Sequence, residues 1–349
     1  MEIVYDTAFG QMNISDAVVS VDNKVRRRSG HMTHAMVEYA PGKIIAFNSN
    51  CSAKRMGGHS AFGWVEYRYS EDYGKSWSGF HELPYSKEIL LDGVYTVSLE
   101  KAVYHDGILT CFLLRNTQAG ECSCEPWDTP LVIQSHDLGK TWSEPVEFGP
   151  WQGRIYDARV KDGIIYVLQS CDKDFLCEPS EEQYRLFVSS DNGKSFQEQS
   201  VVRMSADDNG YGALLFLPDG TLLAYACKIK KNYFLEVCRS NDNGRSWERL
   251  SPIRLSEGIR NVQIAPLGNG YVMHGRGGRG AEWGKGQMLY TSADGLNWDD
   301  GILLEPEKQA CYYSNMLAMT NGEVLLQYSD LYGLYNCVNV MHRFLKVKK

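Results

Sequence analysis

The string SEDYGKSW, residues 70–77, returns four more times along the chain in nearly the same form. The later copies are SHDLGKTW (135–142), SSDNGKSF (189–196), SNDNGRSW (240–247) and the shorter SADGLNW (292–298). The aspartate at the third position falls at 72, 137, 191, 242 and 294, so the copies lie 51 to 65 residues apart. A period of this size is typical of one four-stranded blade of a β-propeller.

Between the copies, short apolar runs flank glycine-containing turns, which is the pattern of β-hairpins. Six such turns occur: YAPGK (39–43), YHDGI (104–108), VKDGI (160–164), LPDGT (217–221), PLGNG (266–270) and MTNGE (319–323). Five hairpins lead into the repeated string, and the sixth leads into NCVNVMHRFLKV (336–347). We therefore expect an all-β protein, a six-bladed β-propeller in a single domain over residues 1–349. An N-terminal strand such as MEIVYDTAF (1–9) would complete the last blade and close the ring.

The residue types of the repeat indicate a structural role. Serine and aspartate side chains bond to nearby backbone amides in turns, and glycine supplies a positive φ. The aromatic residue at the end of each copy is a large apolar anchor for packing the turn against a sheet. We expect the repeat to build the fold, and the chemistry to lie elsewhere.

Bulk composition excludes several classes of protein. The 349 residues carry a net charge of −7, which argues against a nucleic-acid-binding surface. No apolar stretch approaches the roughly 20 residues that span a bilayer. Residues 1–13 lack the pattern of a signal peptide, so we expect a cytoplasmic protein. The ten cysteines lack the spacing of a structural zinc site, and we expect reduced thiols, no metal and no cofactor.

In a propeller, the innermost strand of each blade lines a central channel. The hairpin alignment places polar side chains near the starts of these six strands: His34, Glu100, Asp157, Tyr211, Arg260, Tyr313 and Asn315. Apolar residues would suffice to pack a channel. An imidazole, carboxylates, a guanidinium and phenols together indicate a site for a polar ligand.

The ends of the second strands add further basic side chains. Arg115 ends the run CFLLR, and the segment HGRGGRG (274–280) contains Arg276 and Arg279. Four glycines leave the backbone of this segment open, so its arginines can hold a carboxylate in a two-pronged hydrogen bond. The alternative is a loop with solvated arginines.

The five repeats resemble the Asp-box, or BNR, repeat of the sialidase superfamily, whose fold is a six-bladed β-propeller. The resemblance implies three arginines on a sugar carboxylate, a tyrosine nucleophile with a glutamate beside it, and a loop aspartate as general acid. The segment Tyr313-Ser314-Asn315-Met316 resembles the family's Tyr-Ser-x-Leu nucleophile string. Arg279 resembles one family arginine, and Glu100 with Arg115 resembles the family's Glu…Arg pair.

The chain departs from the family pattern in three places, so it resembles a divergent member. The Glu…Arg pair lies in the second blade, earlier than in the family. HMTH (31–34) stands where the family has a Phe-Arg-Ile-Pro signature. The loop expected to carry the acidic aspartate (48–64) contains His59 and no carboxylate, so the general acid is not identified.

Our first functional hypothesis is a sialidase-like glycoside hydrolase that removes a terminal, acidic sugar from oligosaccharides. Tyr313, Glu100, Asp157 and His34 are the candidate catalytic residues. The candidate substrate-binding residues are Arg115, Arg260, Arg276, Arg279, Tyr211, Asn315 and His59. The partner would be a glycan, with no nucleic acid and no membrane, and the oligomeric state stays open.

Two alternatives remain. A polysaccharide lyase would use a His/Tyr pair, His34 or His274 with Tyr313, to abstract a proton beside a uronate carboxylate. A non-catalytic propeller would bind a glycan or a protein without turnover. The insertion at 116–130 is either a lid or rim over the site or a passive excursion.

Overall fold

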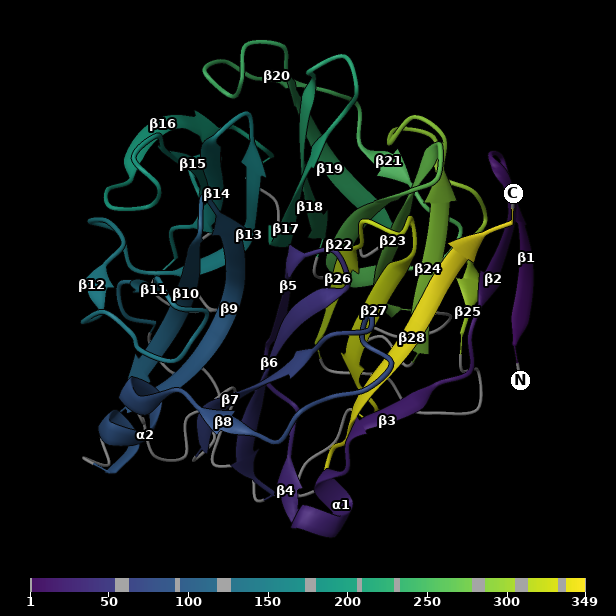
Figure 1. Ribbon diagram of the computed structural model, residues 1–349. Helices are drawn as coiled ribbons and strands as arrows, with labels where there is room; N and C mark the ends of the chain where they lie inside the picture. Colours follow the sequence, from purple (N-terminus) through teal and green to yellow (C-terminus); the bar gives the residue numbers. More distant parts are fainter. Residues whose placement is uncertain are drawn as a thin grey trace.

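The computed structural model describes residues 2–53, 63–91, 95–117, 127–172, 180–205, 209–228, 233–277, 286–304, 313–331 and 337–348. Six antiparallel sheets surround a common axis, and from β4 onward the chain completes each sheet before it begins the next. The six-bladed β-propeller predicted from the repeats is therefore confirmed (Figure 1).

The first three sheets follow one another along the chain. The first contains β4 (Arg28–Ser29), β5 (His34–Ala40), β6 (Lys43–Ser52), β7 (Gly63–Ser70) and β8 (His81–Glu82). The second contains β9 (Tyr95–His105), β10 (Ile108–Thr117), β11 (Leu131–Ser135) and β12 (Val146–Glu147). The third contains β13 (Arg154–Lys161), β14 (Ile164–Ser170), β15 (Tyr184–Ser189) and β16 (Gln197–Val202).

The next two sheets repeat this pattern. The fourth contains β17 (Asn209–Phe216), β18 (Leu222–Lys228), β19 (Phe234–Ser240), β20 (Glu248–Arg249) and β21 (Ile253–Arg254). The fifth contains β22 (Ile259–Leu267), β23 (Gly270–Gly277), β24 (Gly286–Ser292) and β25 (Ile302–Leu303). Two helices, α1 (Asn23–Arg26) and α2 (Pro84–Leu91), complete the regular elements. Within the described ranges, no helix has the length and apolar character needed to cross a membrane.

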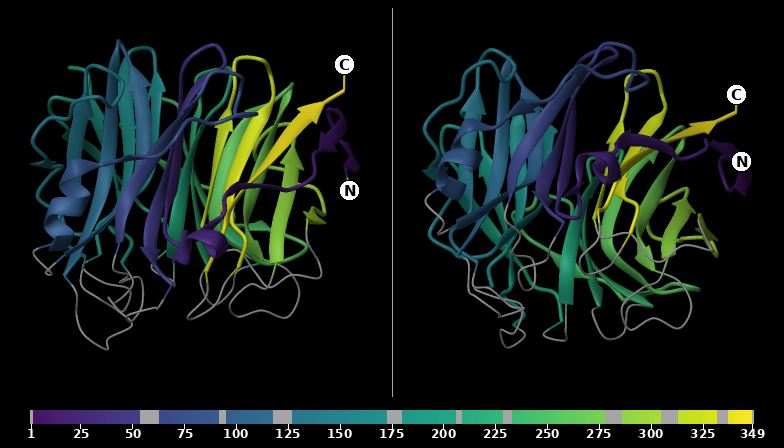
Figure 2. Two further views of the ribbon diagram at one scale, coloured as in Figure 1. Left: turned by 60° about the horizontal axis from the view of Figure 1, so that its bottom comes forward. Right: turned by 90° about the horizontal axis from the view of Figure 1, so that it is seen from below.

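The sixth sheet combines both ends of the chain. It contains β26 (Ser314–Ala318), β27 (Val324–Ser329) and β28 (Val340–Val347), together with the N-terminal strands β1 (Ile3–Thr7), β2 (Gly10–Ile14) and β3 (Val18–Val21). Strands β2 and β3 both pair with β28, so the first residues of the chain extend the last blade. Figure 2 shows both termini on this side of the molecule.

Each of the five repeats folds into the same turn after the third strand of its blade. In the first copy, the Ser70 hydroxyl donates to Asp72 Oδ1 at 2.8 Å and accepts from the amide of Gly74 at 2.8 Å. The fifth copy, one residue shorter, keeps both bonds between Ser292, Asp294 and Gly295 at 3.1 and 2.9 Å. These bonds satisfy the polar groups of the turn locally, as its residue types require.

The turns also join neighbouring blades. The Tyr67 hydroxyl of the first blade donates to the carbonyl of Gly139 in the second at 2.6 Å. Ser200 of the third blade donates to Gly244 O of the fourth at 2.5 Å, and Tyr225 of the fourth donates to Gly295 O of the fifth at 2.7 Å. Because the turns follow the third strands, they lie at the end of the propeller opposite the starts of the inner strands. The repeat therefore holds the ring together, away from the mouth where the polar side chains were expected.

Candidate active site

The innermost strands β5, β9, β13, β17, β22 and β26 line the channel, and each contacts the next around the ring. Two cavities occupy this channel. The first, called here the narrow cavity, measures about 30 Å³ and lies where the inner strands begin. The second, the wide cavity, measures about 380 Å³ and lies toward the ends of these strands. Lys101 and Gln263 line both, and a 2.5 Å hydrogen bond from Lys101 Nζ to Gln263 Oε1 crosses the channel between them.

All six blades contribute side chains to the narrow cavity. Its polar and aromatic lining includes Thr33, His34, Glu100, Arg154, Tyr156, Tyr211, Asn261 and Tyr313. Four of the residues expected from the sequence, His34, Glu100, Tyr211 and Tyr313, are thus brought together here. Sequence reasoning missed Arg154, Tyr156 and Lys101.

Irregularities in four inner strands point these side chains into the cavity. The strand register shifts at Glu100 in β9, at Tyr156 in β13, at Tyr211 in β17 and across Asn261 in β22. Tyr211 and Asn261 have positive φ angles of 47° and 57°, which is uncommon for residues other than glycine. A β-bulge re-aims the side chain of the extra residue, and bulges of this kind are frequent beside functional sites.

Arg154 lies at the centre of the cluster. Its Nη2 donates to the two carboxylate oxygens of Glu100 at 3.0 and 2.9 Å, and its Nε donates to Glu100 Oε2 at 3.1 Å. Its Nη1 donates to the Tyr313 hydroxyl oxygen at 3.1 Å. The side chains of Arg154 and Glu100 are only 2% and 3% exposed, so this ion pair is buried. One guanidinium therefore holds a carboxylate and a phenol in fixed positions.

Local backbone geometry explains how Arg154 reaches this place. It is the first residue of β13 and follows Gly153, whose φ is +133°. A Cβ at Gly153 would overlap the carbonyl oxygen of Ser170, so only glycine allows this close approach. The pair Gly-Arg at the start of a channel strand is the sequence signal that could have identified Arg154.

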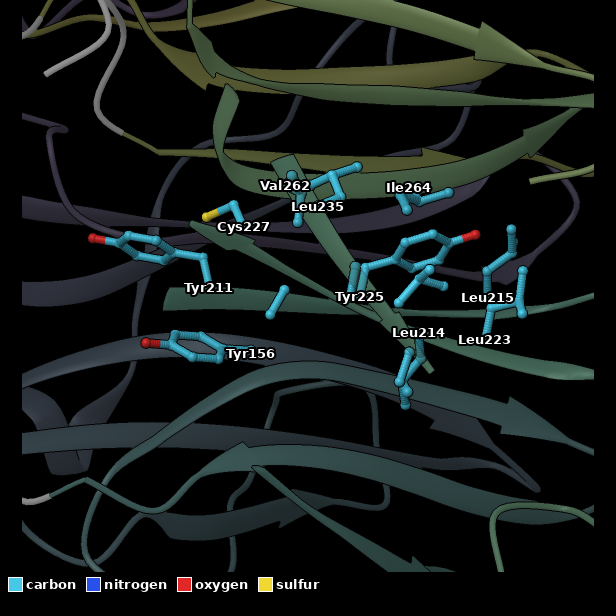
Figure 3. Close-up of a cluster of buried hydrophobic side chains, with 14 of the residues drawn as sticks. Tyr156, Tyr211, Leu214, Leu215, Leu223, Tyr225, Cys227, Leu235, Val262 and Ile264 are labelled. Atoms are coloured by element: carbon cyan, nitrogen blue, oxygen red, sulfur yellow. The ribbon is translucent and has the colours of Figure 1, made fainter. Parts of the chain in front are cut away.

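Aromatic rings surround the guanidinium of Arg154. Its central carbon lies 5.4 to 5.8 Å from the ring centres of four residues, Trp127, Tyr156, Tyr211 and Tyr313. Figure 3 shows Tyr156 and Tyr211 side by side, with their hydroxyl groups pointing away from the apolar core around Leu215 and Leu223. The ring faces stabilise the positive charge of the guanidinium.

Burial and charge set the protonation of the cluster. Burial raises the pKa of the Tyr313 phenol well above its usual value, while the neighbouring Arg154 opposes this rise. Tyr313 is therefore a protonated phenol at neutral pH, with a cation beside its oxygen. Burial lowers the pKa of Lys101, and the nearby Asp157 partly offsets the effect.

His34 begins β5 and is fully buried beside Tyr313. Its Nε2 lies 2.8 Å from the Ser329 hydroxyl, and the backbone amide of Ser329 donates to the Tyr313 carbonyl at 3.1 Å. Burial, together with the proximity of His31, lowers the pKa of His34 to about 3. Its imidazole is therefore neutral at physiological pH.

Two expected residues lie elsewhere in the channel. Asp157 and Asn315 line the wide cavity and not the narrow one. Asp157 accepts hydrogen bonds from the amides of Ala158 and Leu214, both at 2.9 Å, and from Arg159 Nε at 3.0 Å. The bulge at Tyr156 shifts the alternation of β13 and turns Asp157 toward the opposite mouth. Asn315 follows Ser314 along β26 and lies past the residues of this strand that line the narrow cavity.

The expected arginines that the structure describes do not line the narrow cavity. Arg260 and Arg276 are paired across β22 and β23 and are buried, and neither lines the narrow cavity. Arg115 lies 3.5 Å from Asp128 in an ion pair. Arg279, His59 and most of the 116–130 insertion fall outside the described residues. His274 is buried, with Nδ1 2.9 Å from the Ser314 hydroxyl, and does not line the cavity.

The described residues offer no evident metal centre. Within those ranges, no group of three or more histidine, cysteine, aspartate or glutamate side chains is arranged to hold an ion. Six cysteines fall in the same ranges, and none of them is in a disulfide: Cys51, Cys111, Cys171, Cys227, Cys238 and Cys337.

Solved structures with the same architecture include proteins of known and unknown function. A protein of unknown function from Dyadobacter fermentans superposes with a TM-score of 0.71 at 14% identity, covering 97% of this chain and 99% of its own. The NanB sialidase from Streptococcus pneumoniae gives a TM-score of 0.65 at 10% identity, covering 99% of this chain and 70% of its own. The intramolecular trans-sialidase from Ruminococcus gnavus gives a TM-score of 0.63 at 11% identity, covering 94% of this chain and 96% of its own. At these identities the likeness establishes a sialidase-like fold.

No curated protein matches the chain by sequence. The family of BNR repeat-like domains matches residues 14–326, which include all five repeats and most of the six blades. With the propeller and its repeated turns in place, the chain belongs to the BNR repeat-like domain family.

Proposed function

We propose that the protein is a sialidase-like glycoside hydrolase that releases a terminal sugar from an oligosaccharide, with Tyr313 as the nucleophile. One observation carries the proposal: the guanidinium of Arg154 contacts the phenol of Tyr313 and the carboxylate of Glu100 together, inside a buried aromatic cavity. A nucleophile, an ionisable partner and a fixed cation within one cavity are the parts that covalent catalysis needs.

The arrangement suits each charge that develops in the reaction. When the Tyr313 oxygen bonds to the anomeric carbon, the glycosidic C–O bond breaks, the phenol proton passes to Glu100, and the leaving alcohol takes up a proton from water. A second water then displaces Tyr313 from the anomeric carbon, which releases the sugar and returns the proton to the phenol. Arg154 already donates to the phenol oxygen and stabilises negative charge there without reorganisation. The transition state of glycoside cleavage also carries positive charge on the sugar. The carboxylate of Glu100 and the faces of Tyr156 and Tyr211 stabilise that charge.

An acidic sugar is the finer part of this proposal. Arg260 and Arg276 lie together in the fifth blade, at the start of β22 and the end of β23. Asn261, the neighbour of Arg260, lines the narrow cavity, so these two cations lie at the same mouth as Tyr313. A sugar carboxylate oriented toward the fifth blade would gain from their positive charge.

Mass-resolved product analysis tests the proposal. The protein would be incubated with sialylated, uronate-bearing and neutral oligosaccharides, with Tyr313→Phe as the test variant. Tyr166→Phe is the matched control, because Tyr166 is a buried tyrosine of β14 that lines neither cavity. We expect a released sugar with the mass of water added, lost in Tyr313→Phe and retained in Tyr166→Phe.

The other outcomes separate the alternatives. An unsaturated fragment without added water would replace hydrolysis by β-elimination and identify a lyase. Absence of any product, with glycan binding preserved, would identify a non-catalytic glycan-binding propeller.

A further inference from the structure

Two polar atoms on the first-blade side of the narrow cavity have no hydrogen-bond partner in the part of the chain that the structure describes. They are Thr33 Oγ1 and His34 Nδ1. Both side chains line the cavity, and they are only 6% and 2% exposed. A buried polar group without a partner costs free energy, and such groups are rare in folded proteins unless a ligand or water satisfies them.

The contacts of Ser329 determine which His34 nitrogen carries the proton. The Ser329 hydroxyl lies 2.8 Å from the carbonyl oxygen of Gly30, which can only accept, so the single hydroxyl proton is donated there. The Ser329 oxygen is then an acceptor for His34 Nε2, which lies at 2.8 Å and must carry the imidazole proton. His34 Nδ1 is therefore unprotonated and presents a lone pair beside the cavity.

This lone pair selects the chemistry of its ligand. A hydroxyl or an N–H group can donate to Nδ1, whereas a carboxylate has no proton to donate and would bring a second lone pair against the first. The Thr33 hydroxyl can both donate and accept, so it completes the contact with a hydroxyl group. The first blade thus offers a neutral, hydrogen-bonding edge opposite the charged cluster of Arg154 and Glu100.

We propose that Thr33 and His34 form a subsite that binds an uncharged hydroxyl group of the sugar through the Thr33 hydroxyl and His34 Nδ1. The inference rests on the proposed function for the identity of the ligand as a sugar. It orients that sugar in the site, with hydroxyl groups toward the first blade and any anionic group toward the fifth. The position at which sialidases carry an arginine signature is then a hydroxyl-binding position in this chain.

His34 is better suited to bind a ligand hydroxyl group than to abstract a proton from the substrate. A side chain is an efficient general base when its pKa lies near the working pH. The desolvated imidazole of His34 has a pKa of about 3, so its Nδ1 is a weak base that still accepts a hydrogen bond. The same desolvation keeps the ring neutral and its tautomer unchanged across the physiological range.

Nitrogen-15 NMR of labelled histidine tests the subsite directly. The experiment uses the full chain carrying Tyr313→Phe, so that no turnover occurs and the result is independent of hydrolysis. In the free protein we expect the His34 Nδ1 resonance of an unprotonated nitrogen. Adding 3′-sialyllactose, methyl β-glucuronide or lactose in turn should shift this resonance toward the hydrogen-bonded position for at least one sugar. Acetate, an anion without a hydroxyl group, should leave it unchanged.

Matched substitutions separate the two His34 nitrogens. In His34→Asn, the side-chain oxygen takes the place of Nδ1 and can still accept a hydrogen bond from the sugar. In His34→Gln, the side-chain amide takes the place of Nε2, so the bond to Ser329 is kept and the acceptor at Nδ1 is lost. We expect His34→Gln to weaken binding of the responding sugar about tenfold, the effect of one lost hydrogen bond of about 1.4 kcal/mol, and His34→Asn to retain most of it. Thr33→Val should weaken binding, and Thr33→Ser should not.

Several outcomes would overturn the subsite. They are a protonated Nδ1 in the free protein, a response to acetate equal to that for the sugars, the same affinity in His34→Gln and His34→Asn, or no response to any of the three sugars. Failure of hydrolysis with a normal Nδ1 response would overturn the proposed activity alone. The failure of one proposal is therefore distinguishable from the failure of the other.

Discussion

The two cavities of the central channel are built from the same six strands and differ in how their polar groups are satisfied. In the wide cavity, Glu38 accepts from the amide of Gly42 at 2.8 Å and from the amide and hydroxyl of Thr320 at 2.7 and 2.8 Å. Asp157 has three hydrogen-bond donors of its own. Among the described residues, the narrow cavity leaves atoms of Thr33 and His34 without hydrogen-bond partners, and it holds a buried ion pair against a phenol. The proposed site is therefore chosen by its unmet hydrogen bonds and its buried ion pair, and not by its size.

Arginines on one strand give the strongest test of this comparison. Arg154 and Arg159 both belong to β13 and both bond a carboxylate, but the side chain of Arg154 is 2% exposed and that of Arg159 is 27% exposed. Arg154→Met should abolish turnover and lower the free energy of unfolding by about 3–5 kcal/mol, because it leaves Glu100 as an uncompensated buried charge. Arg159→Met should keep turnover and cost about 1 kcal/mol or less. Product analysis and urea denaturation measure both, and equal effects would contradict the comparison.

The two carboxylates provide the second test. Glu100→Gln should lower turnover by about 100-fold or more, because the cavity loses the acceptor of the Tyr313 proton. Asp157→Asn should retain turnover and lower the free energy of unfolding by about 1–3 kcal/mol, because the amide cannot accept all the bonds that the carboxylate receives. A loss of activity in Asp157→Asn with unchanged stability would return Asp157 to the catalytic residues.

A pair of glycines tests whether the wide-cavity end of the ring is structural. Gly244, in a repeated turn, and Gly107, in a hairpin turn, have φ angles of +84° and +79°. A Cβ at Gly107 meets no atom within 4 Å, whereas one at Gly244 would overlap the Leu186 side chain. Gly107→Ala should cost about 1 kcal/mol from backbone strain, and Gly244→Ala about 1–3 kcal/mol more from overpacking between blades. Both variants should keep their activity per folded molecule, and a selective loss of activity in Gly244→Ala would assign the turn a functional role.

The last test concerns the pH dependence of stability at a buried histidine outside both cavities. Burial lowers the pKa of His342 to about 3 from the 6.5 of an unfolded chain. Between pH 3 and pH 6.5 the unfolded chain binds a proton at this histidine that the folded chain does not. The contribution of neutral His342 to the free energy of unfolding is therefore fully present above pH 6.5 and decreases as the pH falls toward 3. The substitution His342→Gln should reduce the dependence of the free energy of unfolding on pH by about 1.4 kcal/mol per pH unit. Urea denaturation at pH 6.0 and pH 4.5 measures the slope, and an unchanged slope would show that His342 is not neutral in the fold.

The sequence predicted the fold from the repeats, because each repeat carries the turn residues and the aromatic anchor that define one blade. It also predicted His34, Glu100, Tyr211 and Tyr313 as neighbours, since all lie near the starts of inner strands. It missed Arg154, although the glycine before this residue was a usable signal, and it misplaced Asp157 for a physical reason. A bulge adds one residue to a strand and reverses the side to which the following residues point. Nothing in the pattern RIYDARV reveals that extra residue.

The pairing of Ile14 with Leu345 has a consequence for the order of folding. Strands β2 and β3 leave the ribosome well before β28, their partner in the sheet, because Ile14 and Leu345 are about 330 residues apart in the chain. At a synthesis rate of about 5–20 residues per second, the N-terminal strands wait roughly 20–70 seconds for it. During that time the outer edge of the sixth blade does not yet exist, and β2 and β3 are open to pairing with another chain. Closing the ring is therefore the step at which a second nascent copy could compete.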